Sequence, residues 1–88
     1  MYYVYILYSE SIKEYYCGQT NDLFNRFARH NKGETQSIKH GIPWKLEGYI
    51  ELVTRSESMR IEKQIKKRGI KRWLAANGAI LQKENFGR

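Results

Sequence analysis

Apolar and aromatic residues at the start of the chain form two short runs typical of β-strands. Residues 2–8 are almost continuously apolar or aromatic, as expected of a strand that is covered on both faces. A polar, turn-like segment follows, and residues 15–20 form the second run, so the simplest interpretation is an antiparallel hairpin. An even number of residues in its loop would place Tyr5 and Tyr16 on one face, and an odd number would place them on opposite faces.

A basic amphipathic helix is predicted next, over roughly residues 22–32. Polar N-cap candidates precede it, and Gly33 supplies a stop at its end. Leu23 and Phe27 share an apolar stripe at helical spacing, and Arg26 and His30 lie beside that stripe, one turn apart. We therefore expect these two basic side chains to face the body of the domain or its rim.

The middle of the chain contains the clearest alternation. Residues 33–41 are expected to form a loop. From Trp44 to Leu52, apolar residues then alternate with polar ones or Tyr49, which predicts a strand with one buried and one wetter face.

Two helices and a tail are predicted for the remainder. Thr54 and Glu57 have the spacing of a capping box, and Gly69 should end the helix that they start. Residues 70–76 predict a short third helix. The last ten residues, 79–88, have little pattern, so we expect a loosely held tail after a domain of residues 1–78. The predicted fold is α+β, with a small three-stranded antiparallel sheet flanked by helices.

Charge gives the first indication of a partner. Sixteen lysines and arginines against nine aspartates and glutamates leave a net charge of +7 on 88 residues, enough for one small domain. This excess favours a polyanion, most commonly nucleic acid, although a basic run can also be only a solvated helix face. The candidate nucleic-acid-binding residues are Arg29, Lys39, Lys63, Lys66, Lys67 and Lys71.

Several other classes of protein are disfavoured. The single cysteine, Cys17, excludes an internal disulfide and a cysteine-based zinc site, and we expect it to be a buried strand residue. No apolar run approaches the roughly 20 residues needed to span a bilayer, and no signal peptide is recognisable. A cytoplasmic location is therefore expected.

Common catalytic signatures are also absent from the sequence. It contains no HExxH, CxxC or GxSxG motif and no glycine-rich phosphate loop after a strand. Any chemistry must come from tyrosines, arginines, a histidine and isolated carboxylates. Taken singly, Tyr5 and Tyr16 are explained as core aromatics, and Glu62 as an ion-pair partner of Lys66 one helical turn away.

The order of these residues resembles the GIY-YIG nuclease superfamily. Val4-Tyr5-Ile6 and, eleven residues after Tyr5, Tyr16-Cys17-Gly18 are similar to its two signature triplets. The helix at 23–31, the start of a strand at 43–46 and the glutamate-bearing helix at 60–66 follow in the family's order, closest to its small stand-alone branch. Gln19 departs from the lysine found in UvrC-type repair endonucleases, which removes one possible phosphate or water contact.

The resemblance implies a catalytic role for each of five residues. Tyr5 would lie near the attacking water as general base, and Tyr16 would position the phosphate or share the proton network. Arg26 suits a forked contact with phosphate oxygens, and His30 could relay a proton or hold a second oxygen. Glu62 would bind one divalent ion, Mg²⁺ or Mn²⁺, whose other ligands are mostly water and phosphate.

The function implied is that of a metal-dependent DNA endonuclease. We expect cleavage to be directed by branched or damaged DNA rather than by sequence, in repair or recombination, because no base-reading motif is present. A targeting protein partner could bring the domain to its substrate. The alternative is a nucleic-acid-binding module of the same fold with little or no cleavage activity.

Overall fold

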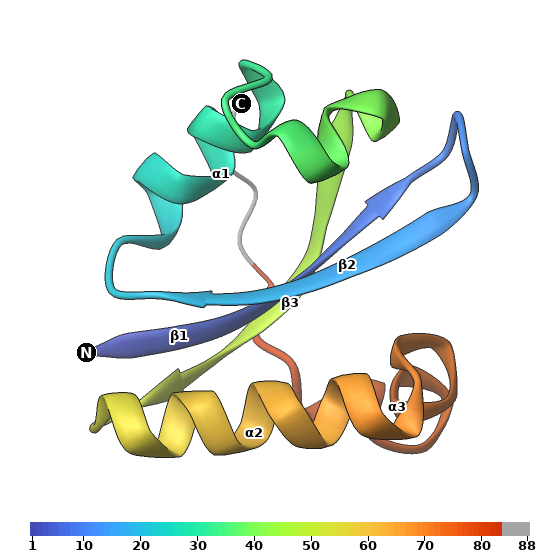
Figure 1. The fold of residues 1–88 in the computed structure, drawn as a ribbon. Coiled ribbons are helices and arrows are strands. Elements are labelled where there is room, and N and C mark those ends of the chain that lie inside the picture. The colour runs from blue at the N-terminus through green and yellow to red at the C-terminus, as the bar shows by residue number, and fades with distance from the viewer. Residues whose placement is uncertain (84–88) are drawn as a thin grey trace.

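A three-stranded antiparallel sheet, in the order β2-β1-β3, forms the centre of the molecule. The structure is a computed structural model and describes residues 1–83. Its elements in chain order are β1 (Tyr2–Ser9), β2 (Glu14–Thr20), α1 (Leu23–Asn31), the 3₁₀-helix η1 (Gln36–Gly41), β3 (Trp44–Leu52), α2 (Arg55–Arg68), α3 (Ile70–Asn77) and the 3₁₀-helix η2 (Gly78–Ile80). Helix α1 and η1 cover one face of the sheet, and α2 and α3 cover the other (Figure 1). This arrangement confirms the predicted fold class.

The hairpin between β1 and β2 has an even loop. Ser9 pairs with Glu14, which leaves the four residues 10–13 in the turn. In this register Tyr5 lies opposite Gly18 and Leu7 lies opposite Tyr16. Since Tyr5 and Leu7 are two residues apart on one strand, Tyr5 and Tyr16 project from the same face. The register therefore decides between the two arrangements that the sequence left open.

Strand β3 does not have one buried and one wetter face, as the alternation predicted. Its pairing with β1 shifts between Ile6 and Leu7, so that Glu47 forms an extra residue between Leu46 and Gly48. A β-bulge of this kind exchanges the two faces of the strand beyond it. Its apolar residues are consequently divided between the two sides of the sheet, and Tyr49, expected on the wetter face, is only 5% exposed.

Capping interactions fix the ends of the helices where the sequence predicted them. The Asp22 side chain accepts from the Asn25 backbone N–H at 3.2 Å and starts α1. Thr54 and Glu57 form a complete capping box at the start of α2. Gly69, with a φ of 97°, ends α2 and allows α3 to begin directly at Ile70. By contrast, the expected loop at 33–41 contains the helix η1.

The sheet separates two hydrophobic clusters. The cluster beneath α2 and α3 consists of Val4, Ile6, Cys17, Ile65, Trp73 and Leu81. The cluster beneath α1 and η1 consists of Tyr5, Leu7, Leu23, Ile38, Trp44 and Tyr49. Asn31 anchors α1 over the second cluster, because its side-chain amide pairs with both the N–H and the carbonyl of Trp44, at 2.7 and 3.0 Å. In the part of the chain described, no helix is long and apolar enough to cross a membrane.

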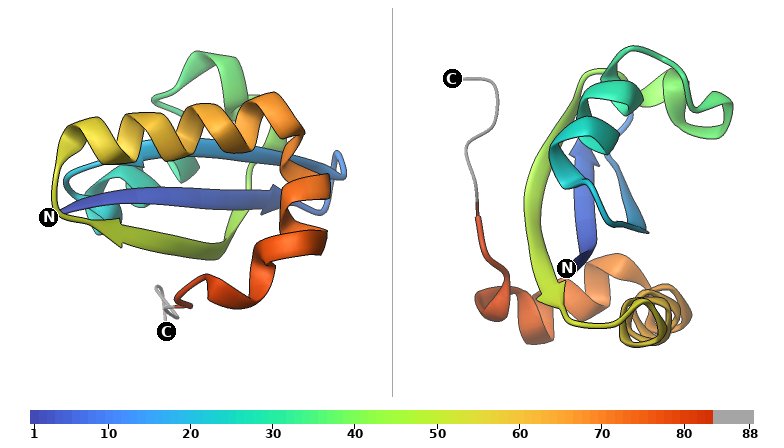
Figure 2. Two further views of the ribbon diagram at one scale, coloured as in Figure 1. Left: turned by 90° about the horizontal axis from the view of Figure 1, so that it is seen from below. Right: turned by 90° about the vertical axis from the view of Figure 1, so that its left-hand side faces the viewer.

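The segment after α3 is packed against the sheet, so the expectation of a loose tail is wrong for its first residues. Leu81 is 8% exposed, and Gln82 exchanges two backbone hydrogen bonds of 2.9 Å with Tyr49. Gly48 makes room for this segment, because a Cβ there would lie 2.7 Å from the Leu81 Cβ. The segment thus runs beside the outer edge of β3 (Figure 2). Residues 84–88 of the predicted tail lie outside the described residues, and the domain boundary at 78 stays a prediction.

We expect Leu81→Ala to lower the free energy of unfolding by about 2–5 kcal/mol, the usual effect of truncating a buried leucine. Ile80→Ala is the matched control, because Ile80 is 65% exposed and should change stability little. Urea unfolding of both variants measures the difference. Equal stability of the two variants would contradict the packing of Leu81 into the core.

Candidate active site

A buried hydrogen bond between Tyr5 and His30 lies at the centre of the candidate site. The Tyr5 hydroxyl is 2.8 Å from His30 Nε2, and the two residues are 0% and 1% exposed. Strand β1 supplies the tyrosine and α1 supplies the histidine. Burial raises the pKa of the Tyr5 phenol, an effect that Tyr16 reinforces and the nearby Arg26 guanidinium opposes. Tyr5 is therefore a neutral phenol at physiological pH in this state.

Gly18 provides the space that the Tyr5 side chain occupies. A Cβ at Gly18 would lie 2.5 Å from the Tyr5 hydroxyl oxygen, 2.7 Å from Tyr5 Cζ and 3.2 Å from Tyr16 Cε2. The glycine of the second triplet is thus required by close approach of two tyrosines rather than by an unusual backbone angle. Without a side chain at position 18, the phenol can cross β2 and reach His30.

His30 is held from both of its ring nitrogens. Nδ1 lies 2.9 Å from Thr35 Oγ1, opposite the bond from Nε2 to Tyr5. Burial lowers the pKa of His30, and the positive charges of Arg26 and Arg29 lower it further. The imidazole is consequently neutral, with one nitrogen donating and the other accepting. One assignment consistent with both contacts has Nδ1–H donating to Thr35 and the Tyr5 hydroxyl donating to Nε2.

Tyr16 completes an aromatic group around this bond. Its ring centroid is 6.3 Å from that of Tyr5 and 5.4 Å from that of His30. Unlike Tyr5, it is only half-buried, because β2 is an edge strand of the sheet. Lys66 of α2 reaches the same ring from the opposite side of the sheet, with Nζ 5.9 Å from the centroid. Residues from both sides of the sheet, His30 of α1 and Lys66 of α2, therefore lie near the Tyr16 ring.

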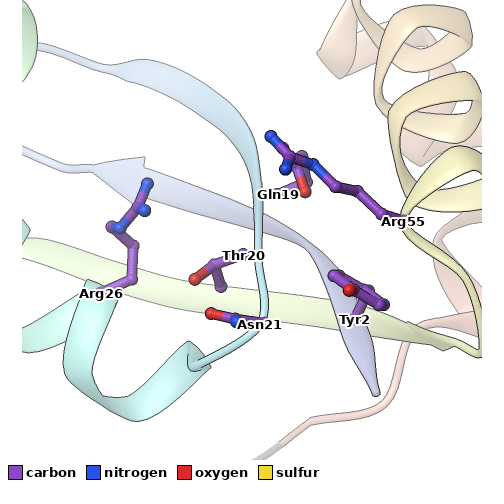
Figure 3. Close-up of a pocket in the computed structure, with 6 residues that line it drawn as sticks. All are labelled: Tyr2, Gln19, Thr20, Asn21, Arg26 and Arg55. Carbon is purple, nitrogen blue, oxygen red and sulfur yellow. The ribbon is translucent and has the colours of Figure 1, made fainter.

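Arg26 lies one turn before His30 on α1 and is half-buried. Its guanidinium lies close enough to Tyr5 for its positive charge to lower the pKa of the phenol. The same residue borders a polar pocket at the end of β2 (Figure 3). Arg26 thus connects the buried pair of Tyr5 and His30 to a surface that an anionic ligand can reach.

Glu62 projects from α2, which covers the other face of the sheet. Its carboxylate forms an ion pair of 2.8 Å with Lys66, as the four-residue spacing suggested, and its side chain is 21% exposed. It also lies close enough to Cys17 to contribute, after burial, to raising the pKa of that thiol to about 12. The structure therefore brings Tyr5, Tyr16, Arg26 and His30 together and connects Glu62 to them only through Lys66 at the edge of β2.

Glu62 is the only predicted site residue with a carboxylate that could coordinate a divalent ion. Within residues 1–83 no group of three or more histidine, cysteine, aspartate or glutamate side chains could hold a metal. A single accessible carboxylate nevertheless suits Mg²⁺, which keeps several water ligands and takes others from a substrate phosphate. Glu62 fits such an ion on condition that Lys66 gives up its present hydrogen bond, which raises the lysine pKa.

The residues predicted to bind nucleic acid are all exposed but do not form one cluster. Arg29 pairs with Glu34 at 3.1 Å on α1, and Lys39 lies on η1 on the same side of the sheet. Lys63, Lys66 and Lys67 lie on α2, and Lys71 lies on α3. Contact with nucleic acid stays a prediction for each of these residues.

Three residues that contribute to the site were not identified from the sequence. Thr35 is in a polar segment with no recognisable motif, so nothing in the sequence predicted its contact with His30. Asn31 lies within the helix predicted at 22–32, where nothing in the sequence indicates its contact with Trp44. Arg55, which borders the same pocket as Arg26, stands inside the capping box and was interpreted as part of a helix start.

The comparison with protein families identifies the domain to which the chain belongs. The family model of the GIY-YIG catalytic domain matches residues 1–73, which is most of the 88-residue chain. The chain belongs to the GIY-YIG family. Membership indicates nuclease-type hydrolysis of phosphodiester bonds, with DNA as the general substrate and a divalent metal ion as a general requirement of the family. No curated protein and no solved structure matched the chain.

We expect Gly18→Ala to lower the free energy of unfolding by about 1–3 kcal/mol, because the added methyl group overpacks the space beside the Tyr5 hydroxyl. Gly78→Ala is the control, since a Cβ there would make an ordinary contact of 3.8 Å with Leu74. Chemical denaturation measures both variants. A Gly18→Ala protein as stable as wild type would show that Tyr5 does not lie across position 18.

The lowered pKa of His30 predicts a loss of stability in mild acid. Below its unfolded pKa of about 6.5, the unfolded chain binds a proton that the folded chain does not. Between pH 7.5 and 5.5 this difference should lower the free energy of unfolding by up to about 1.4 kcal/mol. Urea unfolding at the two pH values should show a smaller drop in His30→Gln than in wild type.

The exposed His40 provides the control for this measurement, because its side chain is 61% exposed. His40→Gln should retain the acid sensitivity of the wild-type protein. If His30→Gln loses as much stability as wild type over the same range, His30 is not the group responsible.

Proposed function

We propose that this protein is a metal-dependent DNA endonuclease whose active site comprises Tyr5, Tyr16, Arg26, His30 and Glu62. The observation that carries the proposal is the hydrogen bond between Tyr5 and His30, placed beside Arg26 at the open edge of a sheet in a GIY-YIG domain. A buried phenol packed only for stability would not need a histidine, an arginine and a second tyrosine around its hydroxyl.

The proton released by the attacking water would move through Tyr5 to His30. A free phenolate is disfavoured because burial raises the Tyr5 pKa, so the phenol must lose its own proton as it accepts another. His30 Nε2 lies 2.8 Å away and can accept that proton if Nδ1–H donates to Thr35. The resulting hydroxide attacks phosphorus, and the bond to the leaving oxygen breaks.

Access to Tyr5 requires a local rearrangement. The residue is 0% exposed, so water can reach its hydroxyl only when neighbouring side chains move aside. The side chains that could move aside are those of Tyr16 and Arg26, because both are half-buried and lie near the edge of β2. Their displacement by a bound phosphate would couple substrate binding to exposure of the base. The phosphate would also offset the positive charge that His30 gains, which is otherwise unfavourable beside Arg26 and Arg29.

Charge neutralisation on the phosphate is assigned to Arg26 and to the ion held by Glu62. A planar guanidinium can contact two phosphate oxygens at once. We propose Mg²⁺ or Mn²⁺ as the ion, which when bound would stabilise negative charge on the phosphate and the leaving oxygen. Lys66 pairs with Glu62 in its present state and would be free to contact the nucleic-acid backbone once the ion replaced it.

The proposed substrate is branched or damaged DNA, in repair or recombination, recognised by its shape. The site lies at a sheet edge between exposed basic residues of α1 and α2, which suits contact with the phosphate backbone rather than with base edges. A separate targeting protein could supply further selectivity. The competing proposal, a module that binds nucleic acid without cutting it, is favoured by the closed state of Tyr5 and by the ion pair that occupies Glu62.

Cleavage assays with point variants distinguish the two proposals. Branched and linear DNA would be incubated with wild-type protein in Mg²⁺, in Mn²⁺ and in chelator. We expect metal-dependent cleavage that falls at least about 100-fold in Tyr5→Phe and in Glu62→Gln, since general base and metal contributions are each typically this large or larger. DNA binding measured in chelator should change much less.

Two conservative variants serve as controls. Tyr15→Phe removes a hydroxyl from the opposite face of the sheet, where Tyr15 packs against the other core cluster and its ring contacts that of Tyr8. Glu51→Gln removes an exposed carboxylate from β3. Both should cleave like wild type. Binding with a steep salt dependence but no metal-dependent cleavage would favour the binding module, and neither binding nor cleavage at low salt would refute both proposals.

A further inference from the structure

A polar pocket of about 210 Å³ lies at the C-terminal end of β2, and Arg26 of the candidate active site forms part of its lining. The residues that line it are Tyr2, Gln19, Thr20, Asn21, Arg26 and Arg55. In Figure 3 Arg26 approaches from α1 and Arg55 approaches from α2, with residues 19–21 between them. The two guanidinium groups therefore reach the same edge of the sheet from its two opposite faces.

Neither arginine is neutralised by the described part of the protein. Among residues 1–83 no carboxylate oxygen lies within 4.0 Å of Arg26 or Arg55, although acidic residues pair elsewhere with Arg29, Lys45 and Lys66. A pocket between two unpaired cations has a strongly positive potential. It therefore favours a ligand with dense negative charge.

Stability does not account for the charge of Arg55. It is the first residue of α2, where the helix dipole favours an acidic side chain and disfavours a basic one. The nearest acidic residue, Glu57, directs its carboxylate to the backbone N–H and hydroxyl of Thr54 in the capping box. Arg55 thus remains exposed and unpaired at an unfavourable position, which suggests a role in binding.

Gln19 adds a directed donor between the two arginines. Its side-chain amide lies 3.3 Å from the Ser58 hydroxyl, whose single proton has a closer acceptor in the Arg55 carbonyl at 2.7 Å, and this contact holds β2 against α2. The Gln19 amide carries two N–H donors, so with either orientation of the amide at least one is available to a ligand in the pocket that Gln19 lines. Two guanidinium groups and an amide N–H₂ are donors only, which matches the acceptor-only oxygens of a phosphate.

We propose that this pocket binds a backbone phosphate of the nucleic acid, held between Arg26 and Arg55 with Gln19 as a third donor. The inference rests on the proposed function and extends its site along β2, from Tyr16 toward Asn21. Arg26 would then lie between the reacting phosphate and a neighbouring one. Arg55 would fix the register of the bound strand from the other face of the sheet.

Salt dependence of DNA binding tests the proposal without requiring cleavage. Fluorescence anisotropy with the same DNA, in chelator, would compare wild type with Arg55→Gln over a range of KCl concentrations. Loss of one phosphate contact should weaken binding at low salt and reduce the slope of log K against log[KCl] by about 1. Arg60→Gln is the matched control, because Arg60 is an exposed arginine on the same helix that does not line the pocket.

A charge reversal separates binding from folding. Arg55→Glu replaces an unfavourable charge at the helix start with a favourable one, so its melting temperature should equal or exceed that of wild type. Its DNA affinity should nevertheless fall below that of Arg55→Gln. If both Arg55 variants keep the wild-type slope and affinity, the pocket does not contact the backbone and the inference is overturned, whether or not the protein cleaves DNA.

Inorganic phosphate is the second probe and distinguishes a backbone site from a site for the free ion. Titration followed by amide NMR should shift the signals of residues 19–21 in wild type and leave them unchanged in Arg55→Gln. These shifts together with the reduced salt slope support the proposal. Shifts without any effect of Arg55→Gln on DNA binding would identify a free-phosphate site and overturn it. Shifts in a wild-type protein that does not bind DNA would overturn both the backbone contact and the nuclease function.

Discussion

The pairing of Tyr5 with Gly18 is the constraint on which the candidate site depends. A four-residue turn sets this register, and the register places the only glycine of β2, Gly18, under the phenol ring. The hydroxyl can then cross β2 and reach His30 on α1. A shift of one residue in the hairpin would put the ring on the other side of the sheet, against Ile65 and Trp73. The length of the turn thus determines that Tyr5 and Tyr16 project together from the face of the sheet that α1 covers.

The burial that secures this geometry also restrains its reactivity. Tyr5 and His30 are both held neutral, the first because burial raises its pKa and the second because burial and two arginines lower its pKa. Neither group is ionised in the closed state, so the pair can exchange a proton but is not a strong base by itself. Activation must come from what binds at the edge of β2, where an anion would favour a cationic imidazole and a nearby cation would favour a phenolate.

Much of the fold could be predicted from the sequence, because the decisive signals were local. Hydrophobic periodicity, the capping box and Gly69 gave the elements and their order, and the family resemblance gave the grouping of Tyr5 with His30. The features that could not be predicted depend on tertiary pairing. The bulge at Glu47 is invisible in an alternating pattern, Leu81 becomes buried only because Gly48 leaves space, and Arg55 acquires significance only when β2 places Arg26 opposite it.

The two edges of the sheet differ in a way that bears on self-association. The outer edge of β3 is covered in part by the segment at Leu81 and Gln82, whereas no strand within residues 1–83 pairs with the outer edge of β2. An uncovered edge strand is a template for pairing with another copy of the chain. Here unpaired arginines stand on both sides of that edge, so two such edges would repel each other. The charges proposed to attract a polyanion would therefore also oppose pairing of two copies of the free protein through this edge.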